Sequence, residues 1–247
     1  MPLKTTINYS PNFNIKKRKK NSVRFLIFHY TGMRNEKDAI NRLTNIQSEV
    51  STHYFIKNDG KILLMVPDLY IAWHAGISQW KKFAYLNKKS IGIEIANPGH
   101  KNGYKNYSKK QINSLIILSS FLIKKYKINK NFVLGHSDIA PERKKDPGEK
   151  FPWQYLAKFG IGKWHSISNR FLKKKRMEKI ERSEEKKFYN NLSKIGYSLK
   201  IPKKIKKDKF LKLLISAFQR RFRQELINGK IDKECFLISQ NLAKKLN

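Results

Sequence analysis

The sequence has one cysteine, few acidic residues and no long hydrophobic run. Cys235 has no second cysteine with which to form an internal disulfide, and a zinc site built from several thiolates is excluded for the same reason. The longest apolar stretch, residues 112–123, is interrupted by Asn and Ser and is too short to cross a bilayer. We therefore expect neither a disulfide framework nor a membrane span.

The N-terminal residues lack the features of a secretory signal. Residues 1–20 carry basic side chains but no apolar segment and no small-residue cleavage site. We therefore expect a cytoplasmic protein, with a periplasmic location by an unrecognised export route as the alternative. The sequence also contains no internal repeat and no glycine-rich phosphate loop.

Acidic residues are outnumbered three to one by basic ones. The 247 residues include 54 Lys and Arg and 18 Asp and Glu, which gives a formal net charge of +36. Such a charge suits a nucleic acid, an anionic membrane or an acidic polymer as partner, but AT-rich codons also favour Lys, Asn and Ile. Since there is no zinc-finger spacing or RNA-recognition aromatic motif, we expect no specific nucleic-acid partner.

The first two thirds of the chain alternate between strand and helix patterns. Helical spacing of apolar residues occurs at 36–46 and at 108–127, where Ser108 is a suitable N-cap. Apolar runs of strand length occupy residues 23–29, 53–57, 61–66, 90–96 and 131–136. Strands mixed with helices predict an α/β layer domain.

The last third of the chain has a different character. A segment rich in Lys, Arg, Glu and Ser, residues 166–187, predicts a linker or a solvated helix. Three helical segments then follow, near 184–195, 207–223 and 232–246. We therefore predict a domain over residues 1–165, a charged linker over 166–183 and a small three-helix domain over 184–247.

Two histidines stand where apolar strands end. His29 closes the first predicted strand, His136 closes the last one, and Asp146 follows in a loop with Pro and Gly. Open α/β sheets place their sites at strand ends. Two imidazoles and a carboxylate would give zinc three protein ligands and leave a fourth position open, as in catalytic zinc sites. Ordinary surface histidines would produce the same scattered pattern.

Glu94 interrupts the apolar strand at residues 90–96. Its neighbours on the same face are Gly92 and Ala96, which leave room for a substrate. A partly buried carboxyl near a metal-bound water is a natural general base. Pairing with a Lys or Arg from a covering helix is the competing explanation for the same residue.

Five segments, taken together, resemble a known enzyme family. They are HYTG at 29–32, THYFIKNDG at 52–60, AWHAG at 72–76, SIGIEIANPG at 90–99 and GHSDIAPERKKDPGEKFPW at 135–153. In this order and spacing they resemble the zinc-dependent N-acetylmuramoyl-L-alanine amidases that recycle muropeptides. The resemblance covers about residues 10–164 and implies a mixed β-sheet flanked by helices.

The resemblance implies a role for each matching residue. His29, His136 and Asp146 match the family's ligands for one zinc ion, and Glu94 matches its catalytic glutamate. Lys144 matches the lysine that stabilises the oxyanion, although from the residues alone Arg143 and Lys145 are equal candidates.

Three further residues match the family's substrate pocket. Tyr54, Trp73 and His74 are therefore candidates for binding the substrate. On sequence alone they serve equally well as core aromatics and as a histidine that supports a ligand. His53 and His100 receive no predicted role.

The C-terminal helices resemble the three-helix peptidoglycan-binding domain of wall hydrolases. The matching segments are FYNNLSKIGY at 188–197, SAFQRRF at 216–222 and NGKIDKECF at 228–236. Cys235 departs from the usual Thr, and the middle loop is rich in lysine. Arg220, Arg221 and Arg223 are candidates for binding acidic peptide carboxylates, and a merely structural bundle is the alternative.

The implied activity is hydrolysis of the amide between N-acetylmuramic acid and L-alanine. Zinc and Lys144 would hold the oxyanion, while Glu94 would take a proton from water and return it to the leaving amine. The expected partner is peptidoglycan or its fragments, and a monomer is expected. A recognition module without catalysis is the alternative, which intact ligands, Glu94 and Lys144 all disfavour.

Overall fold

A six-stranded mixed sheet forms the centre of the N-terminal part. The computed structural model describes residues 4–244. The strands lie in the order β1, β5, β4, β9, β3, β10, and only β4 and β5 run antiparallel to each other. Their bounds are Thr6–Ile7, Ile62–Leu64, Tyr54–Ile56, Ser90–Ile95, Phe25–Tyr30 and Val133–Gly135. The predicted mixed sheet is confirmed.

Helix α2 (Lys109–Tyr126) covers one face of this sheet. Ser108 caps it as predicted, accepting from the backbone N–H of Gln111, whose side chain accepts from the N–H of Ser108. The apolar side of α2 packs against every second residue of β9. These contacts join Ile112, Leu115, Leu118 and Leu122 to Ile91, Ile93 and Ile95 in one core cluster.

Helix α1 (Glu36–Thr44) lies on the opposite face. Its buried residues Ala39 and Leu43 pack with Phe55 and Ala96. Because side chains alternate along a strand, the residues of β9 that do not face α2 point toward the α1 side. Glu94 therefore lies on the face opposite α2.

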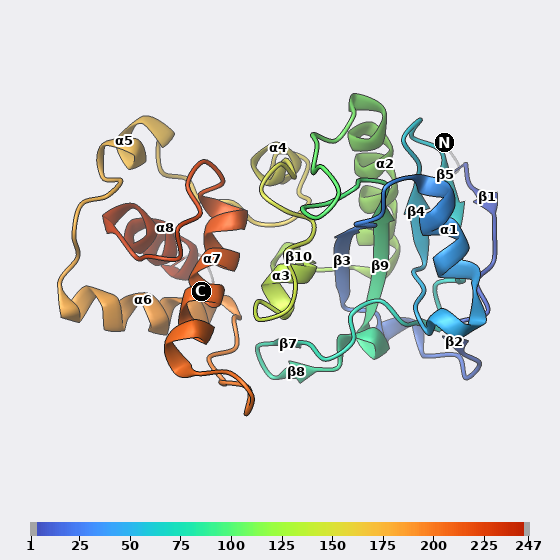
Figure 1. The fold of residues 1–247 in the computed structure, drawn as a ribbon, viewed down its shortest axis with the longest axis horizontal. Coiled ribbons are helices and arrows are strands. Elements are labelled where there is room, and N and C mark those ends of the chain that lie inside the picture. The colour runs from blue at the N-terminus through green and yellow to red at the C-terminus, as the bar shows by residue number, and fades with distance from the viewer. Residues whose placement is uncertain (1–3, 245–247) are drawn as a thin grey trace.

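Three longer helices form the C-terminal part: α6 (Arg182–Ile195), α7 (Lys207–Phe222) and α8 (Lys233–Lys244). They confirm the predicted helices, except that residues 245 and 246 lie outside the described range. Figure 1 shows them in orange and red beside the edge of the sheet at β10. Phe25, Ile27 and Leu134 of the sheet share one hydrophobic core with residues of all three helices.

The segment predicted as a charged linker contains a short helix, α5 (Asn169–Lys174). Leu172 on this helix is buried in the core shared with the bundle. The segment therefore packs against its neighbours, because one apolar side chain gives an otherwise polar stretch a buried face.

The three arginines at the end of α7 point inward. Arg221 is buried and its Nη1 donates to Oδ2 of Asp138, 2.5 Å away, while Arg223 pairs with Asp232. Arg220 is also buried, with Nε 3.7 Å from a carboxylate oxygen of Glu149. These charges hold the bundle together and join it to the sheet domain, which differs from the expected role in binding peptide carboxylates.

Short elements complete the fold. Two small antiparallel ribbons pair β2 with β6 and β7 with β8. These strands and the remaining helices are β2 (Phe13–Asn14), β6 (Ile71–Ala72), β7 (Gln79–Trp80), β8 (Phe83–Ala84), α3 (His136–Ile139), α4 (Trp153–Ala157), η1 (Lys20–Ser22), η2 (Ile46–Ser48), η3 (Leu86–Lys89) and η4 (Lys130–Phe132). Over residues 4–244, none of the helices has the length and hydrophobicity that a membrane crossing requires.

Candidate active site

Two histidines and one aspartate meet where β3 and β10 end. His29 lies near the end of β3, and His136 begins α3 directly after β10. The strands are parallel neighbours, with Phe28 opposite Gly135, so their ends bring the imidazoles together. The two Nδ1 atoms lie 2.9 Å apart, and Oδ2 of Asp146 lies 3.0 Å from each. The three predicted ligand residues thus form one buried cluster.

Backbone contacts hold the loop that carries Asp146. The N–H of Ser137 donates to the carbonyl of Asp146 over 2.8 Å, and the hydroxyl of Tyr107 donates to the carbonyl of Pro147 over 2.6 Å. A Cβ at Gly135 would lie 2.6 Å from Cδ of Pro147. Glycine at the end of β10 therefore lets this loop approach the sheet closely enough for Asp146 to reach both histidines.

Burial keeps the two imidazoles neutral and the carboxylate charged. Desolvation, reinforced by His136, lowers the pKa of His29 to about 4, and desolvation also lowers the pKa of His136. Burial alone would raise the pKa of Asp146, but His136 and His29 outweigh it and hold that pKa below its usual range. Neutral imidazole and ionised carboxylate are the forms that bind metal ions.

The protonation of His136 can be assigned from its surroundings. Its Nε2 lies 3.2 Å from the carbonyl oxygen of Ala75, to which Arg143 also donates over 2.5 Å. A carbonyl oxygen only accepts, and it lies closer to Nε2 than Nη2 of Arg143, which is 3.4 Å away. We therefore assign the proton to Nε2, which leaves Nδ1 to offer its lone pair to the cluster. Buried acceptor atoms this close repel one another unless a cation lies among them. The donor set therefore fits a metal ion with one open position.

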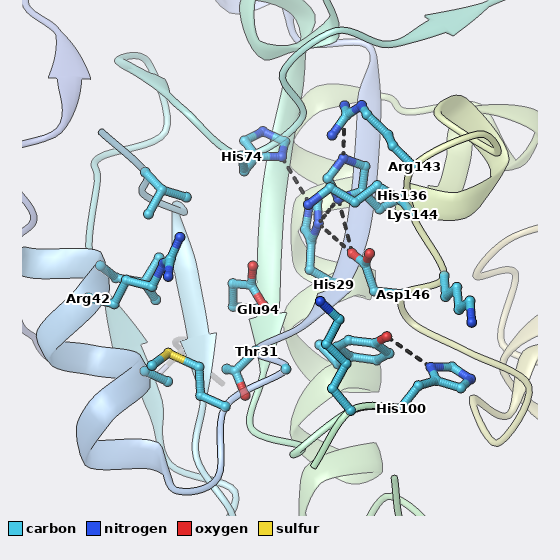
Figure 2. A pocket seen from close by; sticks show the side chains of 18 residues that line it. His29, Thr31, Arg42, His74, Glu94, His100, His136, Arg143, Lys144 and Asp146 are labelled. Atoms are coloured by element: carbon cyan, nitrogen blue, oxygen red, sulfur yellow. Dashed lines mark hydrogen bonds and ion pairs between the residues drawn. The ribbon is translucent and has the colours of Figure 1, made fainter. Parts of the chain in front are cut away.

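Glu94 projects into the same pocket from β9. It pairs in register with His29 across the two central strands, and Figure 2 shows its carboxylate beside the cluster. Its Oε2 is buried and has no hydrogen-bond partner among residues 4–244. Burial, followed by the charge of Asp146, raises the pKa of Glu94 to about 8. A carboxyl of this kind is suited to accept and return a proton near neutral pH.

A cavity of about 500 Å³ surrounds these residues. Lys144 lines it and is less exposed than Arg143 and Lys145, which lie beside it in the sequence. The charge of Lys144 also opposes the rise in the pKa of Glu94, so the two groups act on each other. Arg143 and Lys145 also line the cavity, so what distinguishes Lys144 among the three is its lower exposure and its effect on the pKa of Glu94.

The predicted substrate-binding residues lie in different places. His74 lines the cavity next to His29. Trp73 does not line it, and its indole N–H donates to the side chain of Asn14 over 2.8 Å. Tyr54 is buried on the α2 side of the sheet, where its hydroxyl donates to Asp68 over 2.6 Å. Of the three, the structure brings only His74 to the cavity.

Other cavity residues gave no signal in the sequence. Arg42 of α1 lies across the cavity from the histidines in Figure 2, and Thr31 and Lys101 also line it. His100 hydrogen-bonds to the hydroxyl of Tyr30 over 2.9 Å and so belongs to the cavity wall. Most of these residues come from loops and helix surfaces, where residue type alone does not reveal direction.

Comparison with known proteins identifies the family of this chain. Residues 19–149 match the family model described as N-acetylmuramoyl-L-alanine amidase. The chain is 34% identical over 235 residues to the N-acetylmuramoyl-L-alanine amidase AmiD of Escherichia coli, covering 90% of this chain and 83% of AmiD. It is 39% identical over 104 residues to the 1,6-anhydro-N-acetylmuramyl-L-alanine amidase AmpD of Citrobacter freundii, covering 42% of this chain and 54% of AmpD.

Solved structures extend the similarity to more than nine tenths of the chain. AmiD from E. coli, in complex with anhydro-N-acetylmuramic acid-L-Ala-D-gamma-Glu-L-Lys, matches with a TM-score of 0.79 and 33% identity, covering 91% of this chain and 90% of that one. AmpDh3 from Pseudomonas aeruginosa, in complex with an anhydromuramic pentapeptide, matches with a TM-score of 0.79 and 30% identity. This match covers 97% of this chain and 98% of that one. The chain therefore belongs to the N-acetylmuramoyl-L-alanine amidases, enzymes that hydrolyse the amide bond between N-acetylmuramic acid and L-alanine.

Proposed function

We propose that this amidase works with one zinc ion held by His29, His136 and Asp146. The observation that carries the proposal is the convergence of their three ligand atoms at 2.9–3.0 Å. Tetrahedral zinc with bonds of about 2.0–2.1 Å spaces its ligand atoms by roughly 3.3 Å, so a small relaxation accommodates the ion. When bound, zinc would polarise the scissile carbonyl and acidify a water molecule.

Glu94 is the proposed general base and then the general acid. The Glu94 side chain lines the cavity and its Oε2 has no hydrogen-bond partner among residues 4–244, so no other group of the described chain holds the carboxyl that would take a proton from the attacking water. As the C–N bond breaks, the same carboxyl returns that proton to the amine of L-alanine, which leaves as a neutral group. Glu94 ends the reaction in the state in which it began.

Lys144 is the proposed stabiliser of the oxyanion. Its backbone N–H donates to the carbonyl of Ala140 over 3.0 Å, which holds the residue at the cavity wall. A cation placed in advance near the carbonyl oxygen stabilises the negative charge that develops there.

The proposed substrates are muropeptides, with or without an anhydro sugar, and larger peptidoglycan fragments. Arg42, Lys101 and Lys145 line the cavity with positive charge. The ligand in the AmiD complex contains a D-gamma-Glu residue. Gamma linkage leaves the α-carboxylate of that residue free, and a basic cavity complements such a group.

The test is digestion of anhydromuropeptides and of intact sacculi, followed by mass spectrometry. We expect the enzyme to release the free stem peptide, to lose activity with a chelator and to regain it with added zinc. The substrate that is cleaved faster, anhydromuropeptide or sacculus, shows whether the enzyme prefers soluble fragments or the polymer. Stem-peptide release that persists in the chelator would refute the zinc-dependent mechanism.

A further inference from the structure

The imidazole of His74 lies between a metal-ligand histidine and a buried serine. Its Nδ1 is 3.0 Å from Nε2 of His29, and its Nε2 is 3.0 Å from Oγ of Ser90. His74 and Ser90 are both buried. On the side of His29 that faces away from the cluster, hydrogen bonds therefore continue to His74 and from there to Ser90.

The direction of each hydrogen bond follows from the far end of this chain. The hydroxyl of Ser90 donates to the carbonyl oxygen of Leu86 over 2.7 Å, and it therefore accepts from His74. Nε2 of His74 then carries the proton, and its Nδ1 accepts from Nε2 of His29. The remaining nitrogen of His29, Nδ1, is left with a lone pair directed at His136 and Asp146.

The fold builds a place for the His74 ring. A Cβ at Gly92 on β9 would lie 2.5 Å from Cγ of His74, so the ring occupies the space that this glycine leaves open. The side chain of Asn87 accepts from the backbone N–H groups of His74 and Ala75, over 3.1 and 2.7 Å. The ring is held by its backbone as well as by its hydrogen bonds.

We propose that His74 and Ser90 form a relay that sets the tautomer and orientation of His29 as a metal ligand, so that His74 is a positioning residue and not a substrate contact. The neighbouring carbonyl of Ala75 does the same for His136. The segment 74–75 thus orients both histidines, one through a side chain and the other through the backbone. The part of this proposal that concerns metal binding rests on the proposed function. The tautomers assigned to His74 and His29 do not depend on it.

Three substitutions separate the parts of the relay. His74→Phe keeps a ring but removes the acceptor for His29, His74→Gln keeps one acceptor and one donor, and Ser90→Ala removes only the last step. Supporting partners of metal-ligand histidines are typically worth 10–100-fold in metal affinity. Competition with a chromophoric chelator measures the zinc affinity of each variant. We expect the affinity to fall by about that factor in His74→Phe and by less in Ser90→Ala. In His74→Gln it should lie between the affinities of His74→Phe and the wild type.

His100→Gln is the matched control. His100 lines the same cavity, but it hydrogen-bonds to Tyr30 and Glu149 and not to the cluster. We expect its zinc affinity to equal that of the wild type. Circular dichroism of each metal-free variant shows whether it is folded, and Ser90→Ala keeps the relay testable if His74→Phe does not fold.

Kinetics separate a positioning role from substrate binding. The relay predicts that His74→Phe loses kcat at limiting zinc, regains it in excess zinc and keeps its KM. A raised KM that zinc does not correct, with unchanged zinc affinity, would overturn the proposal.

Nitrogen-15 NMR of the imidazoles in metal-free protein tests the relay without zinc. We expect His74 to carry its proton on Nε2, and a proton on Nδ1 would overturn the relay. If the wild type binds no zinc, the proposed function fails, while this spectrum still decides the hydrogen-bond directions.

Discussion

At the residue scale, the account depends most on Glu94. Its side chain lines the cavity with His29, His136 and Asp146, and its Oε2 is buried without a partner in the described chain. A folded protein tolerates such a group where the reaction uses it, because an unpaired buried polar atom carries a desolvation cost.

Replacing this carboxyl should remove catalysis and leave the metal site intact. We expect Glu94→Gln to lower kcat by about 10²–10⁴-fold, the usual contribution of a general base. Zinc content by mass spectrometry should stay at that of the wild type, because Glu94 is not one of the three ligands. A variant that retains wild-type kcat would show that another group moves the proton.

Asp68 supports a prediction on pH and stability. Burial raises its pKa, but hydrogen bonds from Lys125, Tyr54 and Tyr126 outweigh burial, and the pKa lies below the ordinary 3.8. A carboxyl with a lowered folded-state pKa contributes stability above its unfolded pKa and loses it as the pH falls. Denaturant unfolding should therefore show Asp68→Asn about 2 kcal/mol less stable at pH 7, with the gap closing below about pH 4. A gap that is independent of pH would contradict this assignment.

At the element scale, the ion pair between α7 and α3 joins two parts of the chain. Asp138 accepts from Arg221 over 2.5 Å and from the hydroxyl of Tyr197 over 2.6 Å, and both charged side chains are buried. Removing one member of a buried pair leaves the other charge without compensation.

A double-substitution series tests this junction. We expect Arg221→Met to cost about 3–5 kcal/mol of unfolding free energy, because Asp138 is left buried and charged. Adding Asp138→Asn should recover part of that loss. Chemical denaturation measures both, and strictly additive losses would show that the two side chains do not depend on each other.

The elements that sequence predicted well are those with strong apolar periodicity. The strand at residues 90–96 and the helix at 108–127 were predicted to within about one residue of β9 and α2. His29 and His136 could be placed together because each lies at or beside the end of one of two parallel neighbouring strands, β3 and β10. Tyr54 was expected in the substrate pocket, but it alternates with Phe55 and so faces α2, where its hydroxyl binds Asp68.

The parts that sequence did not predict depend on tertiary contacts. Helix α5 and the ribbons β2–β6 and β7–β8 are too short to show a period. Arg42 and His100 reach the cavity through the packing of α1 and of the turn after β9, neither of which has a local signature. The hydrogen-bond directions around His74 depend on its contacts with Ser90 and His29, which bring together residues from separate segments of the chain.

At the scale of the whole molecule, one hydrophobic core crosses from the sheet into the bundle. Phe25 and Ile27 of β3 belong to the same cluster as Phe188 of α6 and Phe218 of α7. The boundaries 1–165, 166–183 and 184–247 stay a prediction, as do peptidoglycan binding by the bundle, the monomeric state and the cytoplasmic location.

The shared core predicts cooperative unfolding of the whole chain. Calorimetry should show one transition, and Phe218→Ala should shift all of it, since truncating a buried Phe costs about 3–5 kcal/mol. Phe121→Ala is the matched control, because this side chain on α2 is 40% exposed and should change little. Two transitions, of which only one responds to Phe218→Ala, would show that the sheet domain and the bundle are independent.

The most direct test of the central claim is anomalous X-ray scattering at the zinc edge from crystals of the zinc-loaded protein. The account predicts one strong peak per chain, within bonding distance of Nδ1 of His29, Nδ1 of His136 and a carboxylate oxygen of Asp146. Glu94 should face that peak across the cavity without binding it. A peak elsewhere, or none at these three atoms, would contradict the proposed zinc site and the mechanism built on it.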